Sequence, residues 1–177
     1  ESLFTVGKNV ATTEGAVVFE NELFQLIEYK PLTDKVHERP FLMVPPCINK
    51  FYILDLQPDN SLIRYAVSQG HRTFVMSWRN PDESLARKTW DNYIEDGVLT
   101  GIRVAREIAG AEQINVLGFC VGGTMLSTAL AVLQARHDRE HGAVAAPAAK
   151  APAAKRAAGS RSAARTSTAR ATAPAGV

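Results

Sequence analysis

Short continuous apolar runs alternate along this chain with longer segments in which apolar residues recur every three or four positions. The apolar runs are typical of strands covered on both faces, and they occupy residues 41–44, 73–78 and 114–118. The helical spacing occupies residues 60–70, 91–110 and 124–136. Two earlier β-rich runs, 16–19 and 22–30, flank the polar pair Glu20-Asn21 and predict a hairpin.

The order of these elements predicts the fold class. Strand and helix alternate three times with short links, which indicates right-handed crossovers and a parallel sheet. We expect the antiparallel hairpin at the edge of that sheet, so the whole is the front half of a doubly wound α/β fold. Asp59 or Asn60 is available as N-cap of the first helix, and Gly70 and Gly110 are placed to end the first and second.

The last part of the chain belongs to a different physical class. Residues 1–135 carry 12 Lys+Arg against 16 Asp+Glu, whereas residues 136–177 carry 8 against 2. From Ala143 onward there are 16 alanines, no aromatic residue and no acid. Such a segment has too little apolar surface to offset its ordering entropy, so we predict a disordered tail.

The number of cysteines and the absence of targeting signals predict the cellular compartment and the lack of bound metal. Two cysteines, Cys47 and Cys120, make neither a disulfide framework nor a metal-ligand set, so we expect a reducing cytoplasm, no metal and no cofactor. The sequence has no apolar run long enough to span a membrane and no signal peptide at its start. The chain begins with Glu1, which predicts a missing N-terminal piece.

Cys120 lies in the stretch "INVLGFCVGGT", where a predicted strand meets a predicted helix. A nucleophile elbow needs small residues two before and two after the nucleophile, and Gly118 and Gly122 meet that need. The following helix would favour the thiolate through its dipole and unpaired N–H groups, so we expect a lowered pKa for Cys120. The competing interpretation is a buried cysteine packed beside glycines.

A second element of such a site follows the strand 41–44, in "VPPCINKFYILDL". A tetrahedral intermediate needs two N–H groups that converge on its oxyanion. The residue after the nucleophile, Val121, supplies one, and Cys47 or Ile48 supplies the other from this loop. For the Cys47 side chain itself we expect a packing role.

The segments "PPCINKFYILDLQP", "SWRNPD", "TWDNYI" and "NVLGFCVGGT" occur together and in order, and with them the chain resembles class I polyhydroxyalkanoate synthases, the poly(3-hydroxybutyrate) polymerases, from about residue 2 to 135. The resemblance implies an α/β-hydrolase-like fold and an acyltransferase that polymerises (R)-3-hydroxyacyl-CoA, chiefly 3-hydroxybutyryl-CoA, into polyester with release of CoA. It implies Cys120 as the nucleophile that carries the growing chain, a homodimer, and a cytoplasmic enzyme associated with polyester granules.

With this resemblance the chain divides into three regions. Residues 1–80 match the N-terminal region of the synthases and run into the first sheet strands. Residues 81–141 form the hydrolase-like core up to the helix after the elbow. Residues 142–177 are the Ala/Arg/Pro-rich tail.

No histidine is well placed to assist Cys120. In elbow enzymes the acid and the histidine follow the nucleophile on later strands. His137 and His141 lie beyond a helix that starts beside Cys120, and His37 and His71 precede strands, at the opposite sheet edge. The aspartates at 55, 82, 91, 96 and 138 are equally unsuited, so the general base and the acid are absent from these residues.

The sequence therefore suggests a truncated chain whose resemblance stops near Arg136, inactive alone because the downstream Asp and His are missing. Two alternatives of other classes stay open. A thioesterase or lipase-like hydrolase would share the elbow and the sheet. A non-enzymatic fragment could bind polyanions through its basic tail, although a solvated tail is favoured and nucleic acid is not an expected partner.

Overall fold

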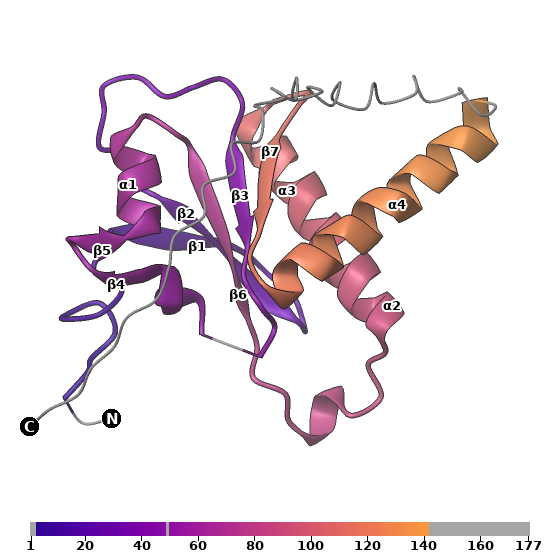
Figure 1. Ribbon diagram of the computed structural model, residues 1–177, viewed down its shortest axis with the longest axis horizontal. Helices are drawn as coiled ribbons and strands as arrows, with labels where there is room; N and C mark the ends of the chain where they lie inside the picture. The colour runs from indigo at the N-terminus through magenta and orange to yellow at the C-terminus, as the bar shows by residue number, and fades with distance from the viewer. Residues whose placement is uncertain (1–2, 49, 142–177) are drawn as a thin grey trace, which may run out of the picture. The chain divides into compact units, whose positions relative to one another are not determined.

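A mixed five-stranded sheet forms the centre of the chain, in the strand order β1-β2-β6-β3-β7 (Figure 1). The structure is a computed structural model and describes residues 3–48 and 50–141. The sheet strands are β1 (Gly15–Glu20), β2 (Phe24–Tyr29), β3 (Phe41–Val44), β6 (Thr73–Trp78) and β7 (Asn115–Gly118). A separate two-stranded sheet pairs β4 (Asp55–Gln57) with β5 (Asn60–Ser61).

The strand directions confirm the α/β class. The hairpin β1-β2 is antiparallel, and β2 also runs antiparallel to β6. The strands β6, β3 and β7 are parallel to one another. Although β3 comes before both β6 and β7 in the sequence, it lies between them, and this order places the ends of β3 and β7 side by side.

The helices occupy the predicted segments, with differences at their ends. They are α1 (Leu62–Ser68), α2 (Trp90–Asn92), α3 (Thr100–Ala109) and α4 (Val121–His141), and a π-helix, η3 (Tyr93–Leu99), joins α2 to α3. Short 3-10 helices cover Phe51–Leu54 (η1) and Glu83–Leu85 (η2). The π-helix was not expected from the spacing of apolar residues.

The predicted start of α1 is wrong by one or two residues. Asn60 belongs to β5 and pairs with Gln57, so the chain is still extended there and the helix begins later. The N-cap is Ser61, whose hydroxyl accepts from the backbone N–H of Arg64 at 2.8 Å. The predicted glycine stops are confirmed, since Gly70 and Gly110 have φ of 81° and 64°.

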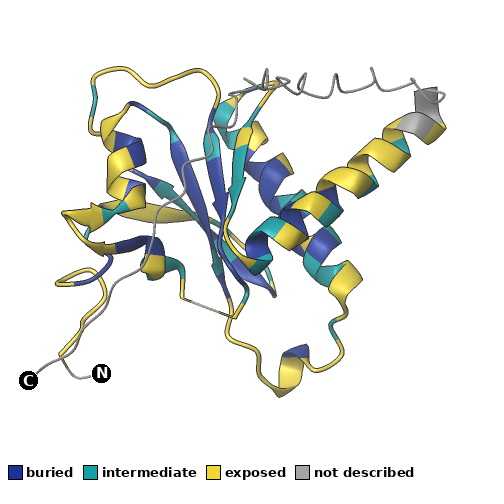
Figure 2. Ribbon diagram, in the orientation of Figure 1, coloured by how far each residue is buried: buried dark blue, intermediate teal, exposed yellow. Residues whose placement is uncertain are grey.

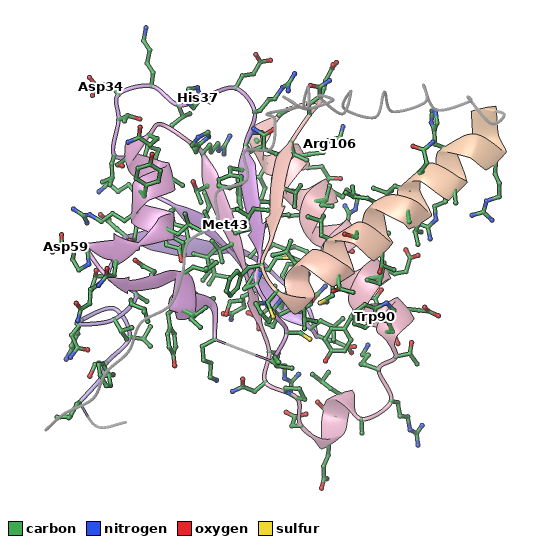
Figure 3. The ribbon with its side chains drawn as sticks, viewed as in Figure 1. Asp34, His37, Met43, Asp59, Trp90 and Arg106 are labelled. Atoms are coloured by element: carbon green, nitrogen blue, oxygen red, sulfur yellow. The ribbon has the colours of Figure 1, made fainter. Side chains whose placement is uncertain are left out.

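Helices cover both faces of the sheet, and each face has its own core (Figure 2). Along β3, Leu42 and Val44 face the cluster that contains residues of η3, α3 and α4, whereas Met43 faces the cluster of α1. This alternation is what a strand buried on both sides requires. Figure 3 shows Met43 in the middle of the sheet.

Three further sequence predictions concern membrane spans, the tail and the division of the chain. Within residues 3–48 and 50–141, no helix is long and apolar enough to cross a membrane. The predicted disordered tail, 142–177, lies outside the described residues. The division of the chain at residue 80 stays a prediction.

Candidate active site

The turn between β7 and α4 presents Cys120 at its tip. Cys120 has a φ of 53°, a left-handed conformation that is uncommon for a residue with a side chain, and it is exposed. The turn is closed by the amide of Gly122, which donates to the Phe119 carbonyl at 2.9 Å, and by that of Gly123, which donates to the Cys120 carbonyl at 2.8 Å. The helix α4 begins at the next residue, Val121. A strand, a sharp turn and a helix therefore follow one another as an elbow requires.

The two flanking glycines are required by space. A Cβ added to Gly122 would lie 2.0 Å from the Val44 carbonyl oxygen, and one added to Gly118 would lie 2.5 Å from the Gly123 Cα. Both distances are far inside van der Waals contact with backbone atoms that cannot move independently. The positions that the sequence predicted to be small are thus the places where β7 and α4 approach each other and the end of β3 most closely.

The loop after β3 lies directly beside this turn. Val44 pairs with Gly118, and its carbonyl accepts from the amide of Phe119 at 3.1 Å. Pro45 and Pro46, which follow, are buried. Cys47 is half-buried and packs against the same core cluster as Val121, whereas Ile48 is exposed. The two segments that were predicted to supply oxyanion donors therefore flank one edge of the sheet.

The backbone amides of the predicted donor residues make no bond to another described residue. In the part of the chain that the structure describes, the backbone N–H groups of Val121, Cys47 and Ile48 donate to no other residue, and that of Cys47 interacts with its own thiol. Val121 is the first residue of α4, so its N–H is one of the groups that a helix start leaves open. The role of these amides as oxyanion donors stays a prediction.

The two thiols differ in their surroundings. Burial raises the pKa of the Cys47 thiol, which keeps it in the neutral form. Cys120 is exposed at the start of a helix.

Trp78 is a further residue at this edge, and its contribution was not expected. It ends β6, is 7% exposed, and donates its indole N–H to the Pro45 carbonyl at 2.8 Å. A tryptophan near a turn is more often a packing anchor than a functional contact. The signal that could have revealed Trp78 is its position at the carboxyl end of a parallel strand, where functional groups of such sheets gather.

The described histidines do not approach Cys120. His37 and His71 lie together with ring centroids 4.9 Å apart, before β3 and before β6. Figure 3 shows His37 on the loop at the edge of the sheet opposite the start of α4 (compare Figure 1). His137 lies sixteen residues beyond Val121 on the same helix, about 24 Å along its axis. The side chain of His141 lies outside the described residues.

Asp55 and Asp82 serve structural contacts. Asp55 is fully buried and accepts from the backbone N–H and the hydroxyl of Thr13 at 3.1 and 2.8 Å. Asp82 caps η2 by accepting from the Ser84 amide, and it forms an ion pair with Arg79. The side chain of Asp138 lies outside the described residues.

The described residues contain no group of three or more His, Cys, Asp or Glu that could hold a metal ion. What the site offers is one exposed thiol on a constrained turn, with backbone amides on two adjacent segments that donate to no other described residue. Thiols of this kind act as nucleophiles on activated carbonyl groups, and converging amides stabilise the resulting oxyanion.

Comparison with known proteins agrees with this geometry. Residues 1–66 match the family described as poly-beta-hydroxybutyrate polymerase (PhaC) N-terminus, and residues 40–158 match the alpha/beta hydrolase fold family. The second match covers the sheet from β3 onward together with the elbow.

Individual relatives are polymerases. The chain is 67% identical over 144 residues to the poly(3-hydroxyalkanoate) polymerase subunit PhaC of Cupriavidus necator, which covers 81% of this chain and 24% of that protein. It is 49% identical over 138 residues to a poly(3-hydroxyalkanoate) polymerase of Methylorubrum extorquens, covering 78% and 23%. The chain therefore spans about a quarter of the length of these relatives. With its sheet order, its elbow and these similarities, the chain belongs to the poly(3-hydroxyalkanoate) polymerase family, a family of acyltransferases on the alpha/beta hydrolase fold.

Proposed function

We propose that this chain contributes the nucleophile and the oxyanion site of a polymerase that joins (R)-3-hydroxyacyl groups from CoA thioesters, chiefly 3-hydroxybutyryl-CoA, into polyester. The observation that carries the proposal is the exposed Cys120 at φ 53° between β7 and α4, with glycines at the two positions where a side chain has no room. The names of the relatives, which are poly(3-hydroxyalkanoate) polymerases, support the substrate class.

The proposed reaction begins with attack of the Cys120 thiolate on the thioester carbonyl. A C–S bond forms, the carbonyl oxygen becomes an oxyanion, and the bond to the CoA sulfur then breaks, so that CoA leaves as its thiolate and takes up a proton. One thioester replaces another, which keeps the acyl group activated for attack by the next hydroxyl. That second attack forms the ester bond and frees the Cys120 sulfur.

The oxyanion would be held by the amide of Val121 and by that of Cys47 or Ile48. Support comes from the N–H groups on both segments, which donate to no other described residue, and from the close contact of Gly122 with the end of β3. Each such donor contributes about 10²–10³ in rate in acyl-transfer enzymes. The positive end of the α4 dipole would add to this stabilisation.

Proton transfer is the part that the described residues do not supply. None of His37, His71 and His137 is placed to take a proton from the Cys120 thiol or from an incoming hydroxyl. We therefore expect acylation of Cys120 to depend on thiolate that forms when the thiol loses its proton to solvent. We also expect negligible polymer formation by this chain alone. A homodimer in the cytoplasm, associated with polyester granules, is part of the proposal for the whole enzyme.

The test is acylation of the purified chain by 3-hydroxybutyryl-CoA at mildly alkaline pH. We expect one 3-hydroxybutyryl group on the Cys120 peptide by mass spectrometry and an equal amount of released CoA. Cys120→Ala should abolish both signals, and Cys47→Ala should leave them in place. Acylation confined to Cys47, or absent from the folded chain, contradicts the proposal.

Analysis of the product separates the polymerase from the hydrolase alternative. A thioesterase or lipase would release free 3-hydroxybutyrate with repeated turnover, whereas a polymerase nucleophile holds the acyl group until a hydroxyl attacks it. Steady release of free acid by the chain would favour the hydrolase.

A further inference from the structure

We propose that Trp78 is a positioning residue for the oxyanion site: its indole N–H holds the Pro45 carbonyl, and thereby sets where the amides of Cys47 and Ile48 point. The inference rests on the proposed function and deepens it. It assigns to a buried tryptophan outside the elbow and outside the donor loop the task of fixing the geometry between them.

Trp78 is joined to the loop after β3 by a hydrogen bond. The Trp78 indole nitrogen lies 2.8 Å from the Pro45 carbonyl oxygen, and both residues are buried. This buried hydrogen bond stabilises the arrangement, because breaking it would leave a buried N–H and a buried carbonyl without a hydrogen-bond partner. Trp78 comes from β6 and Pro45 from the loop after β3, so the bond joins two neighbouring strand ends.

The Pro45 carbonyl group is held from two sides. A Cβ on Gly122 would lie 2.9 Å from the Pro45 carbonyl carbon, which shows how closely the elbow lies against this peptide. On the other side the oxygen is bound by Trp78. The next residue is Pro46, whose ring restricts the backbone further. The orientation of this peptide therefore sets the direction of the backbone at Cys47 and Ile48, the residues whose amides donate to no other described residue.

The Trp78 ring is itself fixed in place by the residues packed around it. Its ring lies 5.9 Å from that of Phe24 and 5.7 Å from that of Tyr93. The π-helix η3 brings Gly97 onto the ring, where a Cβ would lie 2.8 Å from the Trp78 Cη2 atom. A π-helix is rare and occurs often at functional sites. Here it places a residue without a side chain over the indole, so the ring has little freedom to turn away from Pro45.

A purely structural tryptophan would need only the ring, whereas a positioning tryptophan needs the N–H. Two reactions of Cys120 distinguish these roles. Acylation by a thioester passes through an oxyanion, but alkylation by iodoacetamide does not, although both depend on the thiolate and on access to it. The ratio of the two rates therefore reports the oxyanion site separately from the reactivity of the thiol.

The experiment measures both rates at the Cys120 peptide by mass spectrometry, with the N-acetylcysteamine thioester of 3-hydroxybutyrate as the acylating probe. One variant is Trp78→Phe. The other carries benzothienylalanine at position 78 on a Trp90→Phe background, and this amino acid keeps the shape of the indole and removes only its N–H. The Trp90→Phe chain is the reference for the second variant. Phe24→Leu is the matched control, because it truncates a neighbouring ring in the same cluster and leaves the bond to Pro45.

We expect both Trp78 variants to lower the ratio of acylation to alkylation about tenfold, since a displaced donor costs less than the 10²–10³ of a deleted one. Phe24→Leu should leave the ratio within about twofold of the parent. Equal ratios in the parent and in the benzothienylalanine chain would overturn the inference, as would a parallel fall of both rates. If the folded parent shows the same ratio as the chain unfolded in guanidinium, there is no oxyanion site, and the proposed function fails before Trp78 is considered.

Discussion

Glycines mark both edges of the parallel part of the sheet, but they are needed for different reasons at each. At the edge where the strands end, Gly118 and Gly122 leave no room for a Cβ, which would lie 2.5 and 2.0 Å from backbone atoms. At the edge where the strands begin, Gly70 and Gly110 have φ of 81° and 64°, and a Cβ there would meet nothing closer than 3.5 Å.

The difference shows how the same residue type serves the site at one edge and the scaffold at the other. At the first edge the backbones of β3, β7 and α4 lie in close contact, and Cys120 is exposed on the turn between β7 and α4. At the second edge the chain reverses after α1 and α3, and a left-handed residue is the ordinary way to end a helix. The side chains follow the same division, with both thiols near the first edge and the pair His37 and His71 at the second.

The largest effect is expected from Gly122→Ala. The added methyl group would lie 2.0 Å from the Val44 carbonyl oxygen, so the elbow has to open or β3 has to shift. We expect a loss of about 3 kcal/mol or more in the free energy of unfolding, at the upper end of overpacking effects. Denaturant titration measures it.

Gly123→Ala is the control, because its Cβ would lie 3.3 Å from the nearest atom and it is already helical. Its effect should stay within about 1 kcal/mol. Equal losses for the two substitutions would show that space at Gly122 is not what the elbow requires.

A smaller loss is expected from Gly110→Ala at the other edge. No atom lies within 4 Å of the added Cβ, so only the left-handed backbone opposes the substitution. We expect destabilisation by about 1–2 kcal/mol, which is the cost of that conformation for a residue with a side chain. Gly110→Asn should cost less, because asparagine tolerates this region better. A loss as large as that of Gly122→Ala would erase the distinction between the edges.

Substitution of His37 should affect stability a little and the reactivity of Cys120 not at all. His37→Ala removes the contact with the His71 ring and the hydrogen bond between its Nε2 and the Gln69 carbonyl. One such bond is worth about 0.5–1.5 kcal/mol. Alkylation of Cys120 by iodoacetamide should keep its rate and its pH profile. A shifted profile would mean that this histidine reaches the thiol across the sheet.

The smallest effect concerns the pH dependence of Cys47. Burial raises the pKa of its thiol, so the folded state favours the protonated form. Its contribution to stability is therefore present below the pKa of an unfolded thiol and is lost as the pH rises through the folded value. We expect alkylation of the Cys47 peptide to reach half its maximal rate at a higher pH in the folded chain than in the unfolded chain. The reverse order would contradict the burial of this thiol.

Much of this arrangement was predictable from local sequence. The hairpin, the three parallel strands and the helices after them follow from apolar spacing, and the elbow follows from Gly118, Cys120 and Gly122. The misplaced start of α1 and the unexpected η3 have a common reason. The pairing of Asn60 with Gln57 and the contact of Gly97 with Trp78 are made with residues outside the segment concerned.

The sequence by itself determined that Cys120 lies on the turn and that small residues flank it. The reason is that the strand, the glycine-flanked cysteine and the helix are all encoded within a few positions. Only the tertiary structure decided what surrounds that turn. The placement of β3 between β6 and β7 brings the Pro45 loop against Gly122 and under the indole of Trp78. Such contacts join residues far apart in the chain, and their energies depend on distances that no local pattern records.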